Sequence, residues 1–269
     1  MTDSSKLQAV SKALLEARRS ASALAEFPGD LPAKLRDAYA IQSMSIERWP
    51  DEIAGWKVGG IGPNQRGADE SDRLAGPIFA SSVRHIANGE TLTVAIFEGG
   101  FAAIEAELVL KLARDVAPSS RPYTADELRE LVAAVYAGAE IASSPMATIN
   151  ELGPPAVISD FGNNNGLLLG PKIANWTKRN PEPLPMRVTV NGDVVGEAHG
   201  TFGTSTTLGA LRFLLQLCGT RGITLGKGTF VSTGAVTGIH GVDTNSKSSI
   251  EFAGVGRFNV RFEAMQAKS

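Results

Sequence analysis

Two acidic side chains, Glu105 and Glu107, stand two residues apart in an otherwise largely apolar segment between Phe101 and Asp115. In a β-strand, residues i and i+2 point to the same face, so the two carboxylates would project together. Neighbouring carboxylates in apolar surroundings repel each other and lose hydration, so one of them must protonate or find a cation. Carboxylate oxygens favour Mg²⁺, Mn²⁺ or Ca²⁺ over softer metals. The alternative is a helix with a solvated acidic edge, which the run Ala-Glu-Ala-Glu-Leu also suits.

Two further charged residues lie within short apolar segments. Lys57 is flanked by Trp56 and Val58 in a run that ends in glycines, and Glu140 lies in the run Ala-Gly-Ala-Glu-Ile-Ala. A lysine in such a strand either extends its ammonium group to solvent or has a chemical role. An acid in the middle of an apolar segment needs a partner, as the paired acids do.

Length and composition exclude several classes of protein. The chain has 269 residues and a formal net charge of −2, which allows one large domain, or a small and a larger one, and gives no electrostatic basis for binding nucleic acid. The single Cys218 excludes an internal disulfide and a cysteine-based zinc site, and its apolar neighbours predict a buried helix. No stretch approaches the roughly 18 apolar residues of a membrane span, and the N-terminus lacks a signal peptide's apolar block, so we expect a cytoplasmic location.

The hydrophobic pattern predicts two helices at the front of a strand-rich chain. Apolar residues recur at helical spacing over 6–26 and about 32–48. Further helices are predicted at 124–134 and 208–218, strands at 91–97, 167–169 and 229–233, hairpins at 186–195 and 250–262, and loops at 61–72 and 150–155. This order predicts an α+β chain with a mostly antiparallel or mixed sheet. We divide it into an N-terminal helical region, 1–50, and a β-rich domain, 51–269.

Short motifs follow one another in order along nearly the whole chain. They are Tyr39-Ala40-Ile41-Gln42, Gly55-Trp56-Lys57-Val58-Gly59, Ile104-Glu105-Ala106-Glu107-Leu108, Ala139-Glu140-Ile141, Ser159-Asp160 with the run to Gly170, Asn191-Gly192, the helix from Leu208, and Val231-Ser232-Thr233-Gly234-Ala235. This ordered series resembles the fumarylacetoacetate hydrolase superfamily, in its branch of 2-hydroxypentadienoate hydratases and oxalocrotonate decarboxylases. The resemblance implies the β body of that superfamily's C-terminal-domain type, with an N-terminal helical cap.

The resemblance also implies a metal centre, with Glu105, Glu107 and Glu140 as ligands of Mg²⁺ or Mn²⁺. A 2-oxo acid or its enol would chelate the ion, which would act as a Lewis acid and stabilise enolate charge. Lys57, desolvated beside the metal, would have a lowered pKa and would carry protons. Asp160 would orient Lys57 or a water, or would only cap a turn.

Other polar residues are expected to have no direct chemical role. Gln42 is interpreted as a packing or supporting residue. His85, His199 and His240 are expected not to bind metal, because none has ligand spacing with another.

The sequence departs from the family pattern at several positions. An arginine is usual a few residues after the third glutamate, yet 141–145 contains none. Ala-Ser-Ser at 80–82 replaces an aspartate pair, and Ser-Thr-Thr-Leu-Gly at 205–209 replaces a Gly-His-Pro-Leu-Asn segment. Phe161 and Asn163 stand where the family has Asn and a small Ser. The three expected metal ligands and Lys57 match the family pattern, whereas several residues expected around the substrate do not. The resemblance therefore supports the fold and the metal more strongly than it supports a particular substrate.

The leading functional hypothesis is a Mg²⁺-dependent hydro-lyase of aromatic-compound catabolism. It would add water to a 2-hydroxy-2,4-dienoate or 2-oxo-4-enoate and give a 4-hydroxy-2-oxo acid. The alternatives are a 2-oxo-3-hexenedioate-type decarboxylase, a C–C bond hydrolase, and a non-catalytic partner subunit of such an enzyme. A hydrolase of this superfamily would need a His-Glu pair in its N-terminal part, and no histidine precedes His85.

The missing arginine and aspartates favour the non-catalytic subunit, whereas the retained glutamates and Lys57 oppose it. The expected partner is a small 2-oxo or 2-hydroxy-dienoic acid, not nucleic acid or a membrane. Similar proteins assemble as homo-oligomers, so we expect one here, and a complex with a related decarboxylase is a further alternative.

Overall fold

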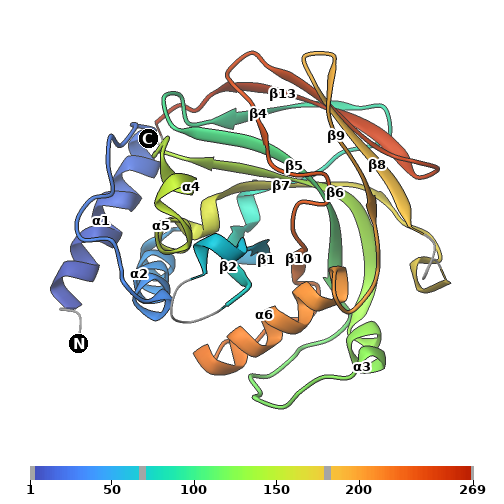
Figure 1. Ribbon diagram of the computed structural model, residues 1–269, viewed down its shortest axis with the longest axis horizontal. Coiled ribbons are helices and arrows are strands. Elements are labelled where there is room, and N and C mark those ends of the chain that lie inside the picture. Colours follow the sequence, from blue (N-terminus) through green and yellow to red (C-terminus); the bar gives the residue numbers. More distant parts are fainter. Residues whose placement is uncertain (1–3, 67–70, 179–182, 268–269) are drawn as a thin grey trace.

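A computed structural model of the chain describes residues 4–66, 71–178 and 183–267 (Figure 1). Its α-helices are α1 (Ser4–Ser20), α2 (Leu35–Arg48), α3 (Ala125–Glu130), α4 (Ile149–Leu152), α5 (Pro154–Ser159) and α6 (Thr207–Arg221). Its strands are β1 (Ile53–Gly60), β2 (Arg73–Phe79), β3 (Val83–His85), β4 (Thr91–Ile96), β5 (Phe101–Leu112), β6 (Val132–Ser144), β7 (Asn164–Lys172), β8 (Leu184–Val190), β9 (Asp193–Gly200), β10 (Phe230–Ser232), β11 (His240–Gly241), β12 (Lys247–Phe252) and β13 (Gly256–Ala264).

Within the described residues, the strands form two sheets of mixed direction. The first has the order β2-β1-β10-β5-β6-β7-β3, with β11 also paired to β5, and the second has the order β4-β13-β12-β8-β9. Most neighbours are antiparallel, whereas β1/β10, β3/β7 and β4/β13 are parallel. The predicted α+β architecture with a mostly antiparallel or mixed β body is therefore confirmed. That the strands divide into two sheets was not predicted.

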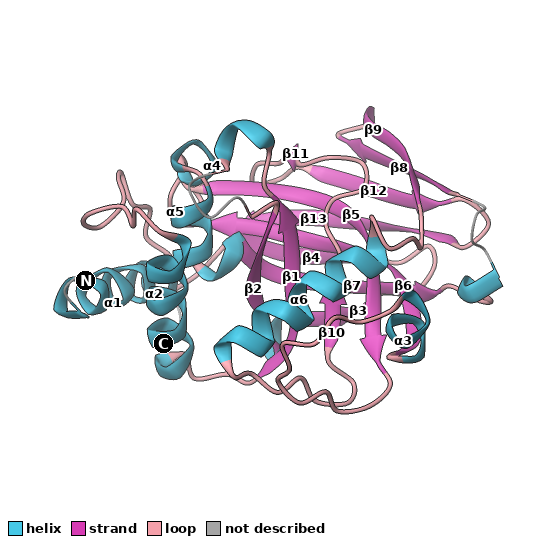
Figure 2. Cartoon of the chain, turned by 60° about the horizontal axis from the view of Figure 1, so that its bottom comes forward, coloured by secondary structure: helices cyan, strands magenta, loops and turns pink. Residues whose placement is uncertain are grey.

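The main hydrophobic core lies between the two sheets. Leu108 and Leu110 of β5 belong to the same buried cluster as Phe258 and Val260 of β13. Helix α6 adds Leu211 and other apolar residues to this cluster, and it crosses in front of the first sheet in Figure 2. Fully burying aliphatic side chains of this size stabilises a fold by about 1.5–3 kcal/mol each. The core therefore holds β5 and β6 rigidly in place.

The N-terminal helices form a separate hydrophobic cluster at one end of the molecule. Leu14 of α1 and Ile41 of α2 are buried together with Ile149 of α4 and Ile158 of α5. Figure 1 shows these four helices gathered beside the sheets, which confirms the predicted helical cap. The division of the chain at residue 50 stays a prediction.

Two predicted helices end earlier than the hydrophobic pattern indicated. The helix predicted over 6–26 ends at Ser20, because the next residue, Ala21, has a φ of 52° and cannot continue the helix. The helix predicted over 124–134 begins with the expected Thr124 cap and ends at Glu130. Val132 already pairs with β5, so sheet pairing overrides helical propensity there.

The predicted loop at 150–155 is wrong, because two short helices, α4 and α5, occupy this region. Gly153 separates them, and Pro154 stands at the first position of α5, where its missing N–H costs nothing. The predicted loop at 61–72 contains a short 3₁₀ turn, Pro63–Gln65, and its residues 67–70 lie outside the described part. No described helix has the length and apolar character needed to cross a membrane.

Candidate metal centre

One face of the first sheet gathers the charged residues singled out from the sequence. Along β5, alternate residues such as Ile104 and Leu108 enter the main core, so Glu105 and Glu107 point to the opposite face. Glu140 of β6 lies directly opposite Glu105 in the antiparallel register. The segment is thus a strand, and the alternative of a solvated helix is wrong.

The three glutamates converge on one buried point. Glu105, Glu107 and Glu140 each offer a carboxylate oxygen, and these oxygens all lie within 4.8 Å of one another. Their side chains are 5%, 0% and 0% exposed. Three buried carboxylates this close together need a compensating positive charge.

In Glu107 and in Glu140, one carboxylate oxygen accepts hydrogen bonds from the protein, and the second oxygen accepts none. Glu107 Oε2 accepts from the hydroxyl of Ser232 and from the backbone N–H of Gly234, the latter at 3.0 Å. Glu140 Oε1 accepts from Asn164 Nδ2 at 2.9 Å. Glu107 Oε1 and Glu140 Oε2 are buried without a hydrogen-bond partner. Because unpaired buried acceptors are rare and costly, these two oxygens are placed to bind a cation.

Lys57 is the cation that the chain itself brings to this cluster. It lies on β1, between Trp56 and Val58 of the main core, so its side chain points to the glutamate face. Its Nζ lies 3.3 Å from Glu140 Oε1 and donates to the backbone oxygen of Gly162 at 2.9 Å. Three carboxylates and one ammonium leave two negative charges, which one divalent ion would balance. The donor set therefore fits a hard divalent cation.

Burial and mutual repulsion raise the pKa of Glu105 and of Glu107. The pKa of Glu105 rises to about 7, first because of burial and then because of the charge of Glu140. The pKa of Glu107 rises well above its usual value for the same two reasons, with the charge of Glu105 added. Without a cation, this cluster therefore holds protons at neutral pH.

The charges of the protein alone raise the pKa of Lys57. Burial lowers the pKa of this ammonium group, but the charges of Glu140, Glu105 and Glu107 together raise it above its usual value. With the protein's own charges, three carboxylates thus outweigh the loss of hydration. The lowered pKa was expected beside a bound metal ion, and for the metal-bound protein it stays a prediction.

A cavity of about 720 Å³ opens beside the cluster. Glu105 is the acidic residue among the described residues that line it, and Lys57, Arg73 and His199 are the basic ones. Hydroxyl groups such as that of Thr233 and apolar side chains complete the lining. The basic side chains favour an anionic organic molecule, and the volume suits a small one.

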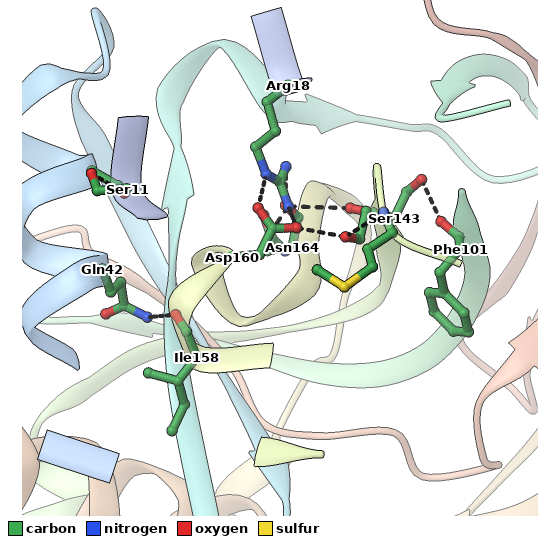
Figure 3. A network of polar contacts seen from close by, with 11 residues as sticks. Ser11, Arg18, Gln42, Phe101, Ser143, Ile158, Asp160 and Asn164 are labelled. Carbon is green, nitrogen blue, oxygen red and sulfur yellow. Dashed lines mark hydrogen bonds and ion pairs between the residues drawn. The ribbon is translucent and has the colours of Figure 1, made fainter. Parts of the chain in front are cut away.

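Asp160 occupies a different place from the one predicted. Arg18 Nε and Nη2 donate to its two carboxylate oxygens at 2.5 and 2.9 Å, and Ser144 Oγ donates to Oδ2 at 2.6 Å (Figure 3). Lys57 donates to Gly162 instead. Asp160 also makes no side-chain cap. The hypothesis that Asp160 orients Lys57 by direct contact is thus wrong, because a guanidinium from helix α1 already occupies the carboxylate. The alternative that Asp160 orients a water stays a prediction.

The supporting residues mostly lie where the sequence placed them. Gln42 is buried and donates from Nε2 to the backbone oxygens of Ala75 and Ile158 at 3.0 Å each, which confirms its supporting role. Cys218 is buried in the main core, as expected. His240 bonds to Thr237 through Nε2. The described glutamate cluster includes no histidine.

Three residues of the site were not identified from the sequence. Ser232 and Asn164 bind the carboxylates of Glu107 and Glu140. Arg18 also donates to the backbone oxygen of Ser143, in the segment where the resemblance expects an arginine that the sequence lacks. Periodicity identifies Arg18 as part of a helix, but only tertiary structure shows which residue faces the sheets.

The fold is similar to that of enzymes whose solved structures contain a divalent metal ion. No family model and no curated protein matches the sequence. The 4-oxalocrotonate decarboxylase from Pseudomonas putida G7, complexed with calcium and acetate, is 18% identical, with a TM-score of 0.80 over 97% of this chain and 99% of that one. The same enzyme complexed with magnesium and adipate is 19% identical, with a TM-score of 0.79 over the same shares.

A fumarylpyruvate hydrolase from Pseudomonas aeruginosa, in complex with Mn²⁺ and pyruvate, is similar over a smaller part. It is 16% identical, with a TM-score of 0.57 over 81% of this chain and 91% of that one. The fold implied by the sequence motifs is therefore confirmed: over almost its whole length, this chain has the fold of 4-oxalocrotonate decarboxylase.

Proposed function

We propose that this protein is an enzyme that uses a divalent metal ion, Mg²⁺ or Mn²⁺, to act on a 2-oxo acid or its enol. One observation carries the proposal. Glu105, Glu107 and Glu140 converge beside a cavity, and two buried oxygens among them have no other partner. Solved structures of the same fold, which hold magnesium, calcium or Mn²⁺, support this proposal.

In this proposal the three glutamates hold the ion, and their neighbours keep the carboxylates in place. A bound ion would supply Lewis-acid chemistry, which stabilises negative charge on an oxo acid as it becomes an enolate. Ser232 and the backbone of Gly234 fix one oxygen of Glu107, which leaves the other free. A carboxylate that is already held in place binds a metal ion more tightly, because its side chain loses less conformational freedom on binding.

Lys57 is the proton carrier of the proposed reaction. It lines the cavity, and its ammonium group can donate a proton as a general acid. Gly162 and Glu140 hold its Nζ from two directions. An ammonium group has three N–H donors, so one remains to deliver a proton to a substrate bound in the cavity.

Two reactions suit such a site. The first is hydration of a 2-hydroxy-2,4-dienoate or 2-oxo-4-enoate to a 4-hydroxy-2-oxo acid. The second is decarboxylation of a 2-oxo-3-hexenedioate. The second has a specific observation in its favour, because Arg73 also lines the cavity and offers a guanidinium to the further carboxylate that only a dicarboxylic substrate has. Arg73 Nη2 already donates to the backbone oxygen of Ser205 at 3.1 Å, which orients it.

A turnover screen with product analysis tests the proposal. The purified chain is mixed with 2-oxo and 2-hydroxy-dienoic acids carrying one or two carboxylates, with Mg²⁺, Mn²⁺ or EDTA. We expect metal-dependent turnover, and release of CO₂ identifies the decarboxylase whereas a 4-hydroxy-2-oxo acid identifies the hydratase. Metal binding without turnover of any of these acids would favour the non-catalytic partner subunit instead.

An arginine variant separates the two substrates. Arg73→Met is expected to raise KM for the dicarboxylic acid far more than KM for the monocarboxylic one, because only the former has a second charge to bind. The cytoplasmic location, the homo-oligomer and the alternative complex with a related decarboxylase remain part of this proposal.

A further inference from the structure

Arg18, in the last turn of helix α1, is a buried cation outside the glutamate cluster. Its side chain is 5% exposed and pairs with Asp160, which is 1% exposed. The rings of Phe97 and Phe161 lie 5.5 and 5.3 Å from its Cζ. A buried ion pair is often no more stabilising than apolar side chains of the same shape. Fold stability alone therefore does not account for a guanidinium at this position.

The remaining donors of Arg18 bind backbone oxygens. Nη1 donates to Asn164 at 3.2 Å, and Nη2 donates to Asp160 at 3.2 Å and to Ser143 at 3.3 Å (Figure 3). One rigid guanidinium thus joins both ends of the segment 160–164 to the end of strand β6. Neither a lysine nor an apolar residue can make this set of contacts, because only guanidinium has five donors in one plane.

The segment 160–164 has a backbone that needs such support. Phe161, Gly162 and Asn163 have φ values of 56°, 69° and 64°, so three consecutive residues are left-handed. For residues other than glycine this conformation is costly and persists only where surrounding contacts impose it. The same segment supplies the Gly162 oxygen that binds Lys57, and it ends with Asn164, whose side-chain amide binds Glu140.

We propose that Arg18 is a positioning residue of the metal centre: by holding the segment 160–164, it sets the positions of both Lys57 and Glu140. This role rests on the proposed function, since it concerns the site that binds the ion. Arg18 holds Asp160 and Asn164, the two ends of the segment. Within the segment, Gly162 binds Lys57 and Asn164 binds Glu140, which connects the N-terminal helix to the metal centre.

The test compares Mn²⁺ affinity, measured by calorimetry, in the wild-type protein and in Arg18→Lys, Arg18→Met and Arg19→Met. Arg19→Met is the matched control, because the neighbouring Arg19 donates to the backbone oxygen of Arg48 and stacks on Trp49, and its described hydrogen bonds do not include the segment. We expect about tenfold weaker Mn²⁺ binding in both Arg18 variants, the size of effect typical of residues that support metal ligands. Arg19→Met is expected to bind as the wild type does.

A double variant separates positioning from stability. Arg18→Met with Asp160→Asn leaves no unpaired buried charge, so its melting temperature should recover relative to Arg18→Met alone. Its Mn²⁺ affinity should stay weak, and hydrogen exchange of the segment 160–164 should stay faster than in the wild type. Wild-type affinity in Arg18→Lys or in the double variant would overturn the positioning role alone. A wild-type protein that binds no Mn²⁺ would overturn the proposed function, and the positioning role with it.

Discussion

Each glutamate of the cluster meets a different local environment. Glu107 is fully buried and bound by Ser232 and Gly234, whereas Glu140 is bound by Asn164 and faces Lys57. Glu105 lines the cavity. Hydrogen bonds from the protein therefore fix Glu107 and Glu140, whereas Glu105 lies beside the cavity in which a substrate would reach the ion. The charge balance of this set explains why the metal-free site holds protons.

The raised pKa of Glu105 predicts a specific pH dependence of stability in the metal-free protein. Its pKa is about 7 in the folded chain and 4.5 ordinarily. Below pH 4.5 the carboxyl is protonated in both the folded and unfolded states; between pH 4.5 and 7 only the unfolded state releases the proton, so the folded state loses stability as pH rises. The loss from this group is at most about 3 kcal/mol.

Urea unfolding in EDTA across this pH window measures the effect. Glu105→Gln should show a smaller fall in the free energy of unfolding than the wild type, because its amide does not titrate. Saturating Mg²⁺ should remove the fall in the wild type, since the ion binds the deprotonated form. Equal slopes for the wild type and Glu105→Gln would contradict the assignment of the shift to this group.

The proton-carrier role predicts that Lys57→Met affects chemistry more than metal binding. We expect kcat to fall by about 100-fold or more, the usual contribution of a general acid. Mn²⁺ affinity should change little or become slightly tighter, because a cation 3.3 Å from Glu140 is removed. Steady-state kinetics and calorimetry measure the two effects, with the exposed Lys247→Met as control. An unchanged kcat would exclude Lys57 from the reaction.

At the scale of elements, the site depends on how strands and one irregular segment meet. The register of β5 and β6 places Glu105 opposite Glu140, and β1 brings Lys57 to the same face through β10. Shifting either strand by one residue would turn its charged residues into the core. The segment 160–164 binds Lys57 and Glu140, so its position affects the site together with the strand register.

Gly76 provides a way to move that segment without touching a charged residue. It lies opposite Lys57 on β2, and a Cβ added there would lie 2.1 Å from the backbone oxygen of Phe161. Gly76→Ala must therefore displace the segment, and overpacking of this kind typically costs about 1–3 kcal/mol. We expect a lower melting temperature together with weaker Mn²⁺ binding.

Gly226→Ala is the matched control for this substitution, because a Cβ at Gly226 meets nothing within 4 Å. Calorimetry and thermal unfolding of both variants give the comparison. If Gly76→Ala binds Mn²⁺ as tightly as Gly226→Ala, the segment does not set the geometry of the site.

At the scale of the whole molecule, the sequence predicted the features that depend on residue spacing and on the order of motifs. The i, i+2 spacing of Glu105 and Glu107 places them on one strand face, and the ordered motifs add Glu140, Lys57 and the fold. The sequence cannot show that Ser232 and Asn164 bind these carboxylates, because such contacts depend on register and on pairing between distant strands. The contacts of Arg18 with Asp160 and Asn164 cannot be predicted for the same reason.

Errors in prediction arose where tertiary structure overrides local propensity. Asp160 was assigned by its place in a motif, but its partner comes from a helix 142 residues away in sequence. The lowered pKa of Lys57 was expected for a desolvated lysine beside the metal, whereas the three converging carboxylates by themselves raise it. The division into two sheets follows from pairing between strands far apart in sequence, such as β4 with β13, which no local pattern reveals.

Cys218 tests the arrangement of the whole core. It lies on α6 in the cluster shared by both sheets, and burial raises the pKa of its thiol to about 12. We therefore expect no reaction with a thiol-specific reagent in native buffer, and full reaction in denaturant, followed spectroscopically. Rapid labelling of the native protein would contradict the packing of α6 against the first sheet.

Calorimetric titration of the EDTA-treated protein with Mn²⁺, at a pH above 7, tests the convergence of the three glutamates most directly. We predict one site per chain in the wild type and in the exposed-residue control Glu130→Gln, and loss of that site in Glu107→Gln with its fold retained. Equal Mn²⁺ binding by Glu107→Gln and the wild type, or no binding by either, would contradict the account.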